Sequence, residues 1–197
     1  MASTSVDVNR TYKNIKGTIR RYNNIAKAAE TWKQRQRTVN AMFGKQTKKK
    51  WDICVKKPDI CKGHLGIHRH LMPQIKKKEI PELKQALNEL GITYVETKRN
   101  PSELHATQDE MDKKKIKEIK SKIMNKSKQP VLGPIIISQE GAIIDGHHRW
   151  AAWKKTHPET PLNVVQIDLP INEALAIITG ALGASTAYTG PTPSLYN

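Results

Sequence analysis

The sequence predicts an α/β (α+β) protein, a small mixed sheet with flanking helices, preceded by a basic helical arm. Residues 79–182 alternate short β-branched segments with segments of helical periodicity, which is the pattern of a compact α/β domain. The net charge of +16 over 197 residues is confined to the start of the chain. Residues 1–78 hold 20 Lys and Arg against four acids, whereas residues 79–197 hold 14 of each. We therefore expect a charged arm joined to a neutral folded module.

The arm and its linker are assigned to residues 1–50. Apolar positions with alternating spacings of four and three predict an amphipathic helix from residue 10 to about 43, with a narrow face for the main domain or a partner helix: Ile15, Ile19, Tyr22, Ala26 and Ala29. A membrane surface is a less favoured partner, because this face lacks bulky Leu and Phe.

The basic residues of the arm predict non-specific binding of nucleic acid, with DNA as the expected partner. A merely solvated lysine-rich surface is the alternative, and the tryptophan that ends the linker either stacks on a base or packs into the core. The candidate residues are Lys13, Lys16, Arg20, Arg21, Lys45, Lys48, Lys49, Lys50 and Trp51.

Residues 51–78 form a lead-in segment with a concentration of possible metal ligands, namely Cys54, Cys61, His64, His68 and His70. Their C-x6-C-x2-H-x3-H spacing lacks the tight cysteine pairs of most zinc sites, so the spacing does not favour zinc. We expect buried thiols and surface histidines instead. Two cysteines are also too few for a disulfide-stapled scaffold.

The folded domain is assigned to residues 79–182 and a flexible tail to residues 183–197. We expect a helix from Pro81 to Gly91, a strand over 92–97, and a helix that a Thr107/Glu110 capping box opens and that ends near Met124. A hairpin over 134–145, a helix from about His147, a strand over 162–168 and a helix over 171–182 complete the domain.

The strongest chemical signal is Asp145-Gly146-His147-His148-Arg149, where a predicted strand turns into a predicted helix. Free N–H groups at a helix start accept phosphate, and glycine permits close approach. The two histidines and the arginine add donors, and Asp145 is suited to hold Mg²⁺ or to orient a nucleophile. A surface turn that the histidines merely cap is the alternative.

The stretch from Asn100 to Asp168 resembles the ParB/sulfiredoxin superfamily, in the branch with an Asp-Gly-His-His-Arg turn that contains nucleotide-dependent kinases and ParB-like nucleases of plasmids and phages. The resemblance rests on a loop ending in Gln108, a helix, a strand hairpin and the Gly146-x-x-Arg149 turn. It implies a sulfiredoxin-like fold that binds ATP, ADP or CTP with Mg²⁺ at Gly146, His147, His148 and Arg149, with Gln108 nearby.

The resemblance also implies that Asp145 is the metal ligand or the acid/base residue. His147 or His148 is a candidate to protonate a leaving oxygen, because imidazole titrates near neutral pH. Glu103 is preferred to Glu110 as the base, because Glu110 suits the capping box. His147 occupies the place of the catalytic cysteine of sulfiredoxins, which argues against sulfinic acid reduction. About 30 residues follow Asp168, too few for the helix-turn-helix domain of ParB.

Two functions of different classes follow. The first is a DNA-associated NTP hydrolase, phosphotransferase or nuclease, and the second is a non-catalytic DNA-binding, virion or packaging component. The segment 66–75 resembles a stretch of tailed-phage proteins, which suggests phage structural or packaging partners. We expect the protein in the host cytoplasm or associated with a virion, and not in a membrane, because no apolar run approaches about 20 residues.

Overall fold

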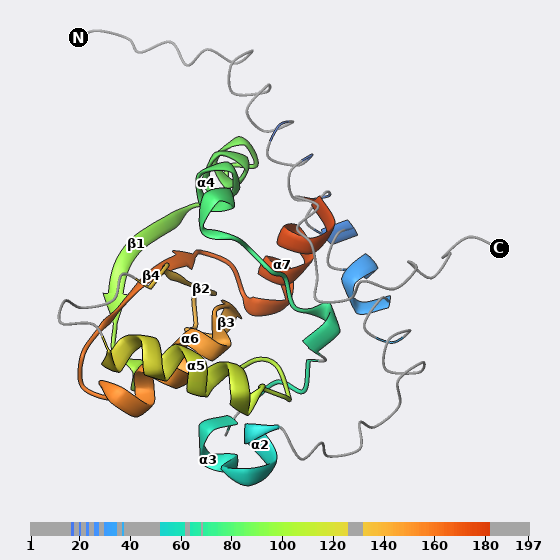
Figure 1. Cartoon of the computed structure of the whole chain (residues 1–197). Helices are drawn as coiled ribbons and strands as arrows, with labels where there is room; N and C mark the ends of the chain where they lie inside the picture. Colours follow the sequence, from blue (N-terminus) through green and yellow to red (C-terminus); the bar gives the residue numbers. More distant parts are fainter. Residues whose placement is uncertain are drawn as a thin grey trace, which may run out of the picture.

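The structure is a computed structural model that describes residues 52–61, 64–67, 69–125 and 132–181, together with scattered positions between 17 and 37 (Figure 1). Its centre is a four-stranded sheet in the order β1-β4-β2-β3. The strands are β1 (Tyr94–Arg99), β2 (Ile135–Ile137), β3 (Ile143–Asp145) and β4 (Leu162–Ile167). β4 is parallel to β2 and antiparallel to β1, and β3 is antiparallel to β2. The predicted mixed α/β class with flanking helices is confirmed.

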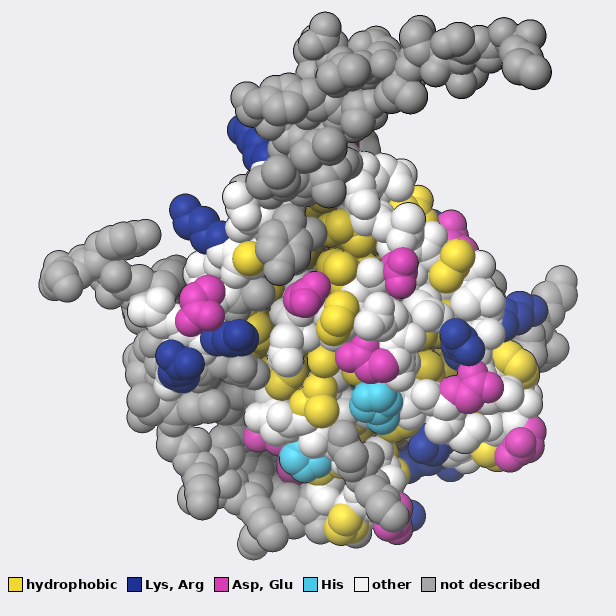
Figure 2. All heavy atoms as spheres, turned by 180° about the vertical axis from the view of Figure 1, so that it is seen from behind, with side chains coloured by type: hydrophobic (Ala, Val, Ile, Leu, Met, Phe, Trp, Pro, Cys, Tyr) yellow, Lys and Arg dark blue, Asp and Glu magenta, His cyan; other side chains and the backbone are white. Residues whose placement is uncertain are grey.

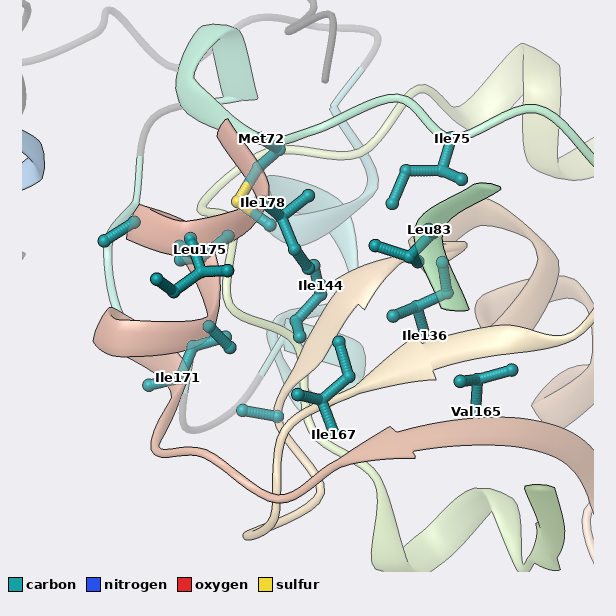
Figure 3. Packing of buried hydrophobic residues seen from close by; sticks show 14 of the residues in the cluster. Met72, Ile75, Leu83, Ile136, Ile144, Val165, Ile167, Ile171, Leu175 and Ile178 are labelled. Carbon is teal, nitrogen blue, oxygen red and sulfur yellow. The ribbon is translucent and has the colours of Figure 1, made fainter. Parts of the chain in front are cut away.

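Both faces of the sheet are covered, so the fold has three layers. Successive strand residues alternate between two apolar clusters, as the two-residue period of a strand requires. One cluster holds Ile136, Ile144, Val165 and Ile167 with residues of α4 (Ile80–Glu89) and α7 (Ile171–Ala176) (Figure 3). The other holds the alternate strand residues with α5 (Lys113–Met124) and α6 (His147–Thr156).

The short elements complete the chain path. They are α2 (Ile53–Lys56), α3 (Pro58–Cys61), the 3-10 turns η1 (Arg69–Leu71), η2 (Lys77–Glu79) and η3 (Pro101–Glu103), and the π-helical turn η4 (Ile177–Ala181) that continues α7. Helices near the predicted positions at 81–91, 147 and 171 are present. The first strand runs two residues later than predicted, from residue 94 to 99 rather than from 92 to 97.

Residues of the predicted lead-in segment contribute to both core clusters. Ile67, Leu71, Met72 and Ile75 are buried on the α4/α7 side, and Ile53 is buried on the α5/α6 side. Backbone pairing joins this segment to the loop before α5, because Asp52 pairs with Asp112 and Ile67 pairs with Gln108. The lead-in segment therefore holds the loop between η3 and α5 in place.

The expectation of free thiols is wrong. Cys54 and Cys61 form a disulfide that links α2 to α3, with their Cα atoms 5.4 Å apart. The turn at Lys57 and Pro58 lets two four-residue helices fold back on each other, which brings the sulfurs together across a separation of seven residues. The described residues contain no free cysteine.

The predicted capping box is also wrong. The N-cap of α5 is Asp112, whose Oδ1 accepts the N–H groups of Lys114 at 2.8 Å and Lys115 at 3.4 Å. The Thr107 hydroxyl instead donates to the carbonyl oxygen of Ile143 at 2.6 Å. The helix does end at Met124, as predicted, with Ile116 and Ile123 buried.

Only part of the arm is described. Trp32 is 2% exposed and belongs to the cluster with α7, whereas Ala26, predicted for the apolar face, is exposed. Arg20 is exposed and helical. The other arm residues predicted for nucleic acid, the remaining members of the predicted apolar face, and the tail after residue 181 lie outside the described residues.

Candidate functional site

The predicted turn lies where β3 meets α6, between the sheet and the helix layer. β3 ends at Asp145, Gly146 has a φ of 103°, and α6 begins at His147. A Cβ at residue 146 would lie 2.8 Å from Ile135 Cδ1 and 2.9 Å from Arg149 Nη2. Glycine is therefore required here for two reasons, its backbone conformation and the close approach of neighbouring side chains.

The N-cap residue of α6 is Gly146, which has no side chain, and no side-chain hydrogen bond caps the start of this helix. The first helical hydrogen bond runs from the Trp150 N–H to the Gly146 carbonyl oxygen at 2.9 Å. The N–H groups of the preceding residues of the turn have no intrahelical acceptor, and together with the helix dipole they favour an anion.

Arg149 is turned back toward the sheet and paired with Asp145. Its Nη2 donates to Asp145 Oδ2 at 2.9 Å and to the Pro134 carbonyl oxygen at 3.2 Å. Burial raises the pKa of Asp145, and the Arg149 guanidinium and the Gly146 N–H oppose that rise. The Nε of Arg149 is buried and has no partner among the described residues. Nη2 of Arg149 thus holds the turn to the sheet, whereas its Nε donates no hydrogen bond within the described residues.

His147 connects α6 to the loop before α5. Its Nε2 accepts the Thr107 N–H at 3.2 Å and lies 2.9 Å from the Thr107 hydroxyl. The side chain is 4% exposed, and burial, together with nearby His148 and Arg69, holds its pKa well below the usual range. His147 is therefore neutral near pH 7 and accepts, rather than donates, at this nitrogen.

His148 has the same role one residue later. Its Nε2 accepts the Asp112 N–H at 3.0 Å. Burial, reinforced by the cations Arg69 and Lys115, lowers its pKa to about 3. The two histidines thus fix both ends of the loop from Thr107 to Asp112 against the first turn of α6, and neither Nε2 is free to bind a ligand.

Two cations near the turn come from elements outside the motif. Arg69 of η1 lowers the pKa of both histidines, and Lys115 of α5 lowers the pKa of His148 and of Asp145. Neither forms a salt bridge within the described part of the chain. Sequence analysis missed both as neighbours of the turn, because nothing in the sequence around them marks them.

The loop held by the histidines contains two buried polar groups with unused capacity. Gln108 is 2% exposed, and its Nε2 has no partner in the described residues. Burial, with Glu110 next to it, raises the pKa of Asp109 to about 6. Besides its neighbour Glu110, the charged groups that act on Asp109 are His64 and Asp52 of the lead-in segment, and its buried Oδ1 has no partner among the described residues.

The structure places the two glutamates considered as bases in different surroundings. Glu103 on η3 is exposed, and its carboxylate pairs with Arg99 at 3.7 Å and accepts from Asn100 Nδ2 at 3.2 Å. Glu110 is 5% exposed. Because Asp112 caps α5, the reason for preferring Glu103 to Glu110 no longer holds.

The turn offers few donors to a metal ion. Asp145 supplies one carboxylate at the turn, which suits Mg²⁺ because in phosphoryl-transfer sites Mg²⁺ is held by one or two carboxylates with the phosphates of the ligand. The described residues contain no group of three His, Cys, Asp or Glu that would hold a metal by itself. Both cysteines of the possible zinc set are bonded to each other.

Comparison of the chain with protein-family profiles, curated proteins and solved structures finds no match. Among the helices that the structure describes, none is both long enough and apolar enough to cross a lipid bilayer.

Proposed function

We propose that this protein is a ParB-like domain protein that binds the phosphate groups of a nucleotide or nucleic acid at the first turn of α6. The observation that carries this proposal is the uncapped start of α6. Two cations from other elements, Arg69 and Lys115, lie near enough to lower the pKa of His148 in its first turn and form no salt bridge among the described residues. Charge-assisted donors around a helix N-terminus are the usual means of holding phosphate oxygens.

The proposed donors differ from those of the sequence interpretation. The backbone N–H groups of the first turn, Arg69, Lys115 and the unused Nε of Arg149 supply hydrogen bonds and charge. His147 and His148 position the neighbouring loop through their neutral Nε2 atoms. Asp145 is the residue that would hold Mg²⁺ brought by a nucleotide, where the metal would neutralise phosphate charge.

The second candidate function is phosphoryl chemistry, either NTP hydrolysis or transfer or phosphodiester cleavage, with Asp145 as the acid/base or metal-holding residue. Its supporting observation is the carboxylate at the end of β3, whose side chain is 13% exposed. The two histidines are neutral and bonded to the backbone, which supports the first candidate, binding without catalysis. A general acid that works at neutral pH needs an accessible proton and a pKa nearer to that pH.

The test is thermal unfolding of the full chain with ATP, ADP, CTP, GTP or a short oligonucleotide, with and without Mg²⁺. Binding to the folded form alone stabilises it, by about 2.7 kcal/mol at a ligand concentration 100 times the Kd. We expect at least one ligand to stabilise the wild type. Arg69→Gln and Lys115→Gln should each weaken the affinity for that ligand about tenfold or more. Lys98→Gln on β1, which removes the same charge far along the sheet, is the matched control.

Absence of stabilisation by every ligand, or equal weakening by the Lys98→Gln control, would refute the proposal. Hydrolysis and DNA cleavage are then measured on the wild type and on Asp145→Asn. Activity lost in that variant supports the enzymatic candidate. Binding without activity in the wild type supports the non-catalytic one.

A further inference from the structure

A second basic surface lies on the folded module, away from the turn before α6. α5 has the sequence KKKIKEIKSKIM, with six lysines and one glutamate. Its buried side chains are Ile116 and Ile123, so Lys113, Lys117 and Lys120, at spacings of four and three, form a row on one exposed flank.

Packing of α5 against α6 extends this row. Lys57, Lys113 and Lys120 all act on Lys155 at the end of α6, and burial together with these three charges lowers its pKa. We call Lys57, Lys113, Lys117, Lys120 and Lys155 the lysine face. Figure 1 shows α5 beside α6, with α2 and α3 next to them.

The charges of the lysine face are not neutralised internally. Among the described residues, none of its five lysines forms a salt bridge, whereas lysines elsewhere on the module do, such as Lys84 with Glu96 at 2.7 Å. The face seen from behind in Figure 2 has acidic side chains interspersed with Lys and Arg. Like charges gathered without counter-charges destabilise the folded state, so their placement calls for an external anion.

We propose that the lysine face binds the phosphate backbone of double-stranded DNA without reading its sequence. The three lysines of the α5 row span about 10 Å, at 1.5 Å per helical residue. One DNA strand presents a phosphate every ~3.4 Å of helix axis, so the row spans about three phosphates. Lysine contacts phosphate as a point charge, which supplies affinity rather than base selectivity.

An anionic membrane suits this surface less well. Interfacial binding uses several bulky apolar side chains beside the basic ones. The exposed residues of α5 are instead lysines with Glu118 and Ser121, and Met124 at the end of the row is the one large exposed apolar side chain among the described residues of this helix. Lys115, which flanks the turn, is about 160° around α5 from Lys113, at 100° per residue, so the two sites are separable by mutation.

The test compares two triple variants of the full chain with the same net charge. Lys113→Gln/Lys117→Gln/Lys120→Gln removes the α5 row, and Lys77→Gln/Lys78→Gln/Lys98→Gln removes three exposed lysines of η2 and β1. Fluorescence anisotropy with a labelled duplex of about 30 base pairs gives the affinity between ~50 and ~200 mM salt. All substituted side chains are exposed and glutamine is a good helix former, so both variants should fold, which thermal unfolding verifies.

We expect the row variant to reduce the slope of log K against log salt by about 2 to 3, since each phosphate contact contributes ~0.9. The control should reduce it by less than about 1. Lys155→Gln, as a second variant, should reduce it by about 1. Equal slopes for both triple variants, or row-dependent binding to anionic vesicles or polyglutamate but not to DNA, would overturn the proposal. Nucleotide-dependent stabilisation should be unchanged in the row variant, so the two proposals fail independently.

Discussion

The turn before α6 and the lysine face use charged residues in opposite ways. At the turn, polar side chains are bonded to one another and to the backbone, as Arg149 is to Asp145 and Pro134 and as both histidines are to the loop before α5. On the lysine face, no charge is paired among the described residues. The side chains of the Asp145 to Arg149 motif therefore mainly stabilise the turn, whereas the lysines of α5 carry charges that remain unpaired in the described part of the chain.

This comparison predicts that the turn is sensitive to small changes. Gly146→Ala should lower the free energy of unfolding by about 3 kcal/mol, from ~1–2 kcal/mol of backbone strain plus the contacts with Ile135 and Arg149. Gly66→Ala is the matched control, since Gly66 also has a positive φ, of 66°, but nothing within 4 Å of its added Cβ. It should cost about 1 kcal/mol by urea unfolding. Equal losses would show that the turn is not tightly packed.

The neutral histidines predict a specific dependence of stability on pH. Because the pKa of His148 is about 3 in the folded state, only the unfolded chain gains this proton between pH ~6.5 and ~3, and acidification destabilises the fold. Asp109, with its pKa raised to about 6, acts oppositely below pH 6, so the comparison must be made between variants.

His148→Gln retains an acceptor for the Asp112 N–H and removes the titration. Its unfolding free energy relative to the wild type should therefore rise by ~1.4 kcal/mol per pH unit as the pH falls below about 6.5. Urea unfolding at several pH values between about 7 and 5 measures this difference. A constant difference would mean that His148 titrates normally in the folded protein.

The smallest expected change in unfolding free energy comes from the lysine face, where a substitution should stabilise the protein. Lys155→Gln should raise the unfolding free energy by about 0.5 kcal/mol at low ionic strength, because it relieves repulsion from Lys57, Lys113 and Lys120. The gain should disappear at about 1 M salt, where the Debye length is ~3 Å. Lys98→Gln should change stability by less at either salt concentration. Destabilisation that persists in high salt would indicate a packing role for Lys155.

Local patterns predicted most of the fold. The hairpin strands, the end of α5 at Met124 and the start of α6 at His147 follow from periodicity, glycine placement and β-branched runs. The Thr107 capping box failed because its hydroxyl finds an acceptor 36 residues away, at Ile143. A local pattern cannot compete with a buried partner that only the tertiary fold supplies.

The candidate site was predictable in position but not in detail. The sequence motif placed Asp145 to Arg149 at a strand-to-helix turn, where the structure has them. The roles of the histidines depend on Thr107 and Asp112, and the flanking cations Arg69 and Lys115 come from two other elements. The neutral overall charge of residues 79–197 likewise hid the lysine face, because charge totals carry no information on where side chains gather.

The burial of Trp32 has a consequence for how strongly the protein would hold a long polyanion. Because this side chain is 2% exposed in the cluster with α7, the exposed Lys27 and Lys33 in the helical residues beside it are anchored to the folded module. A DNA strand held at the lysine face, as proposed, would meet these two lysines at a raised effective concentration. Avidity of this kind depends on ligand length, and a duplex too short to reach both the lysine face and these lysines would lose it.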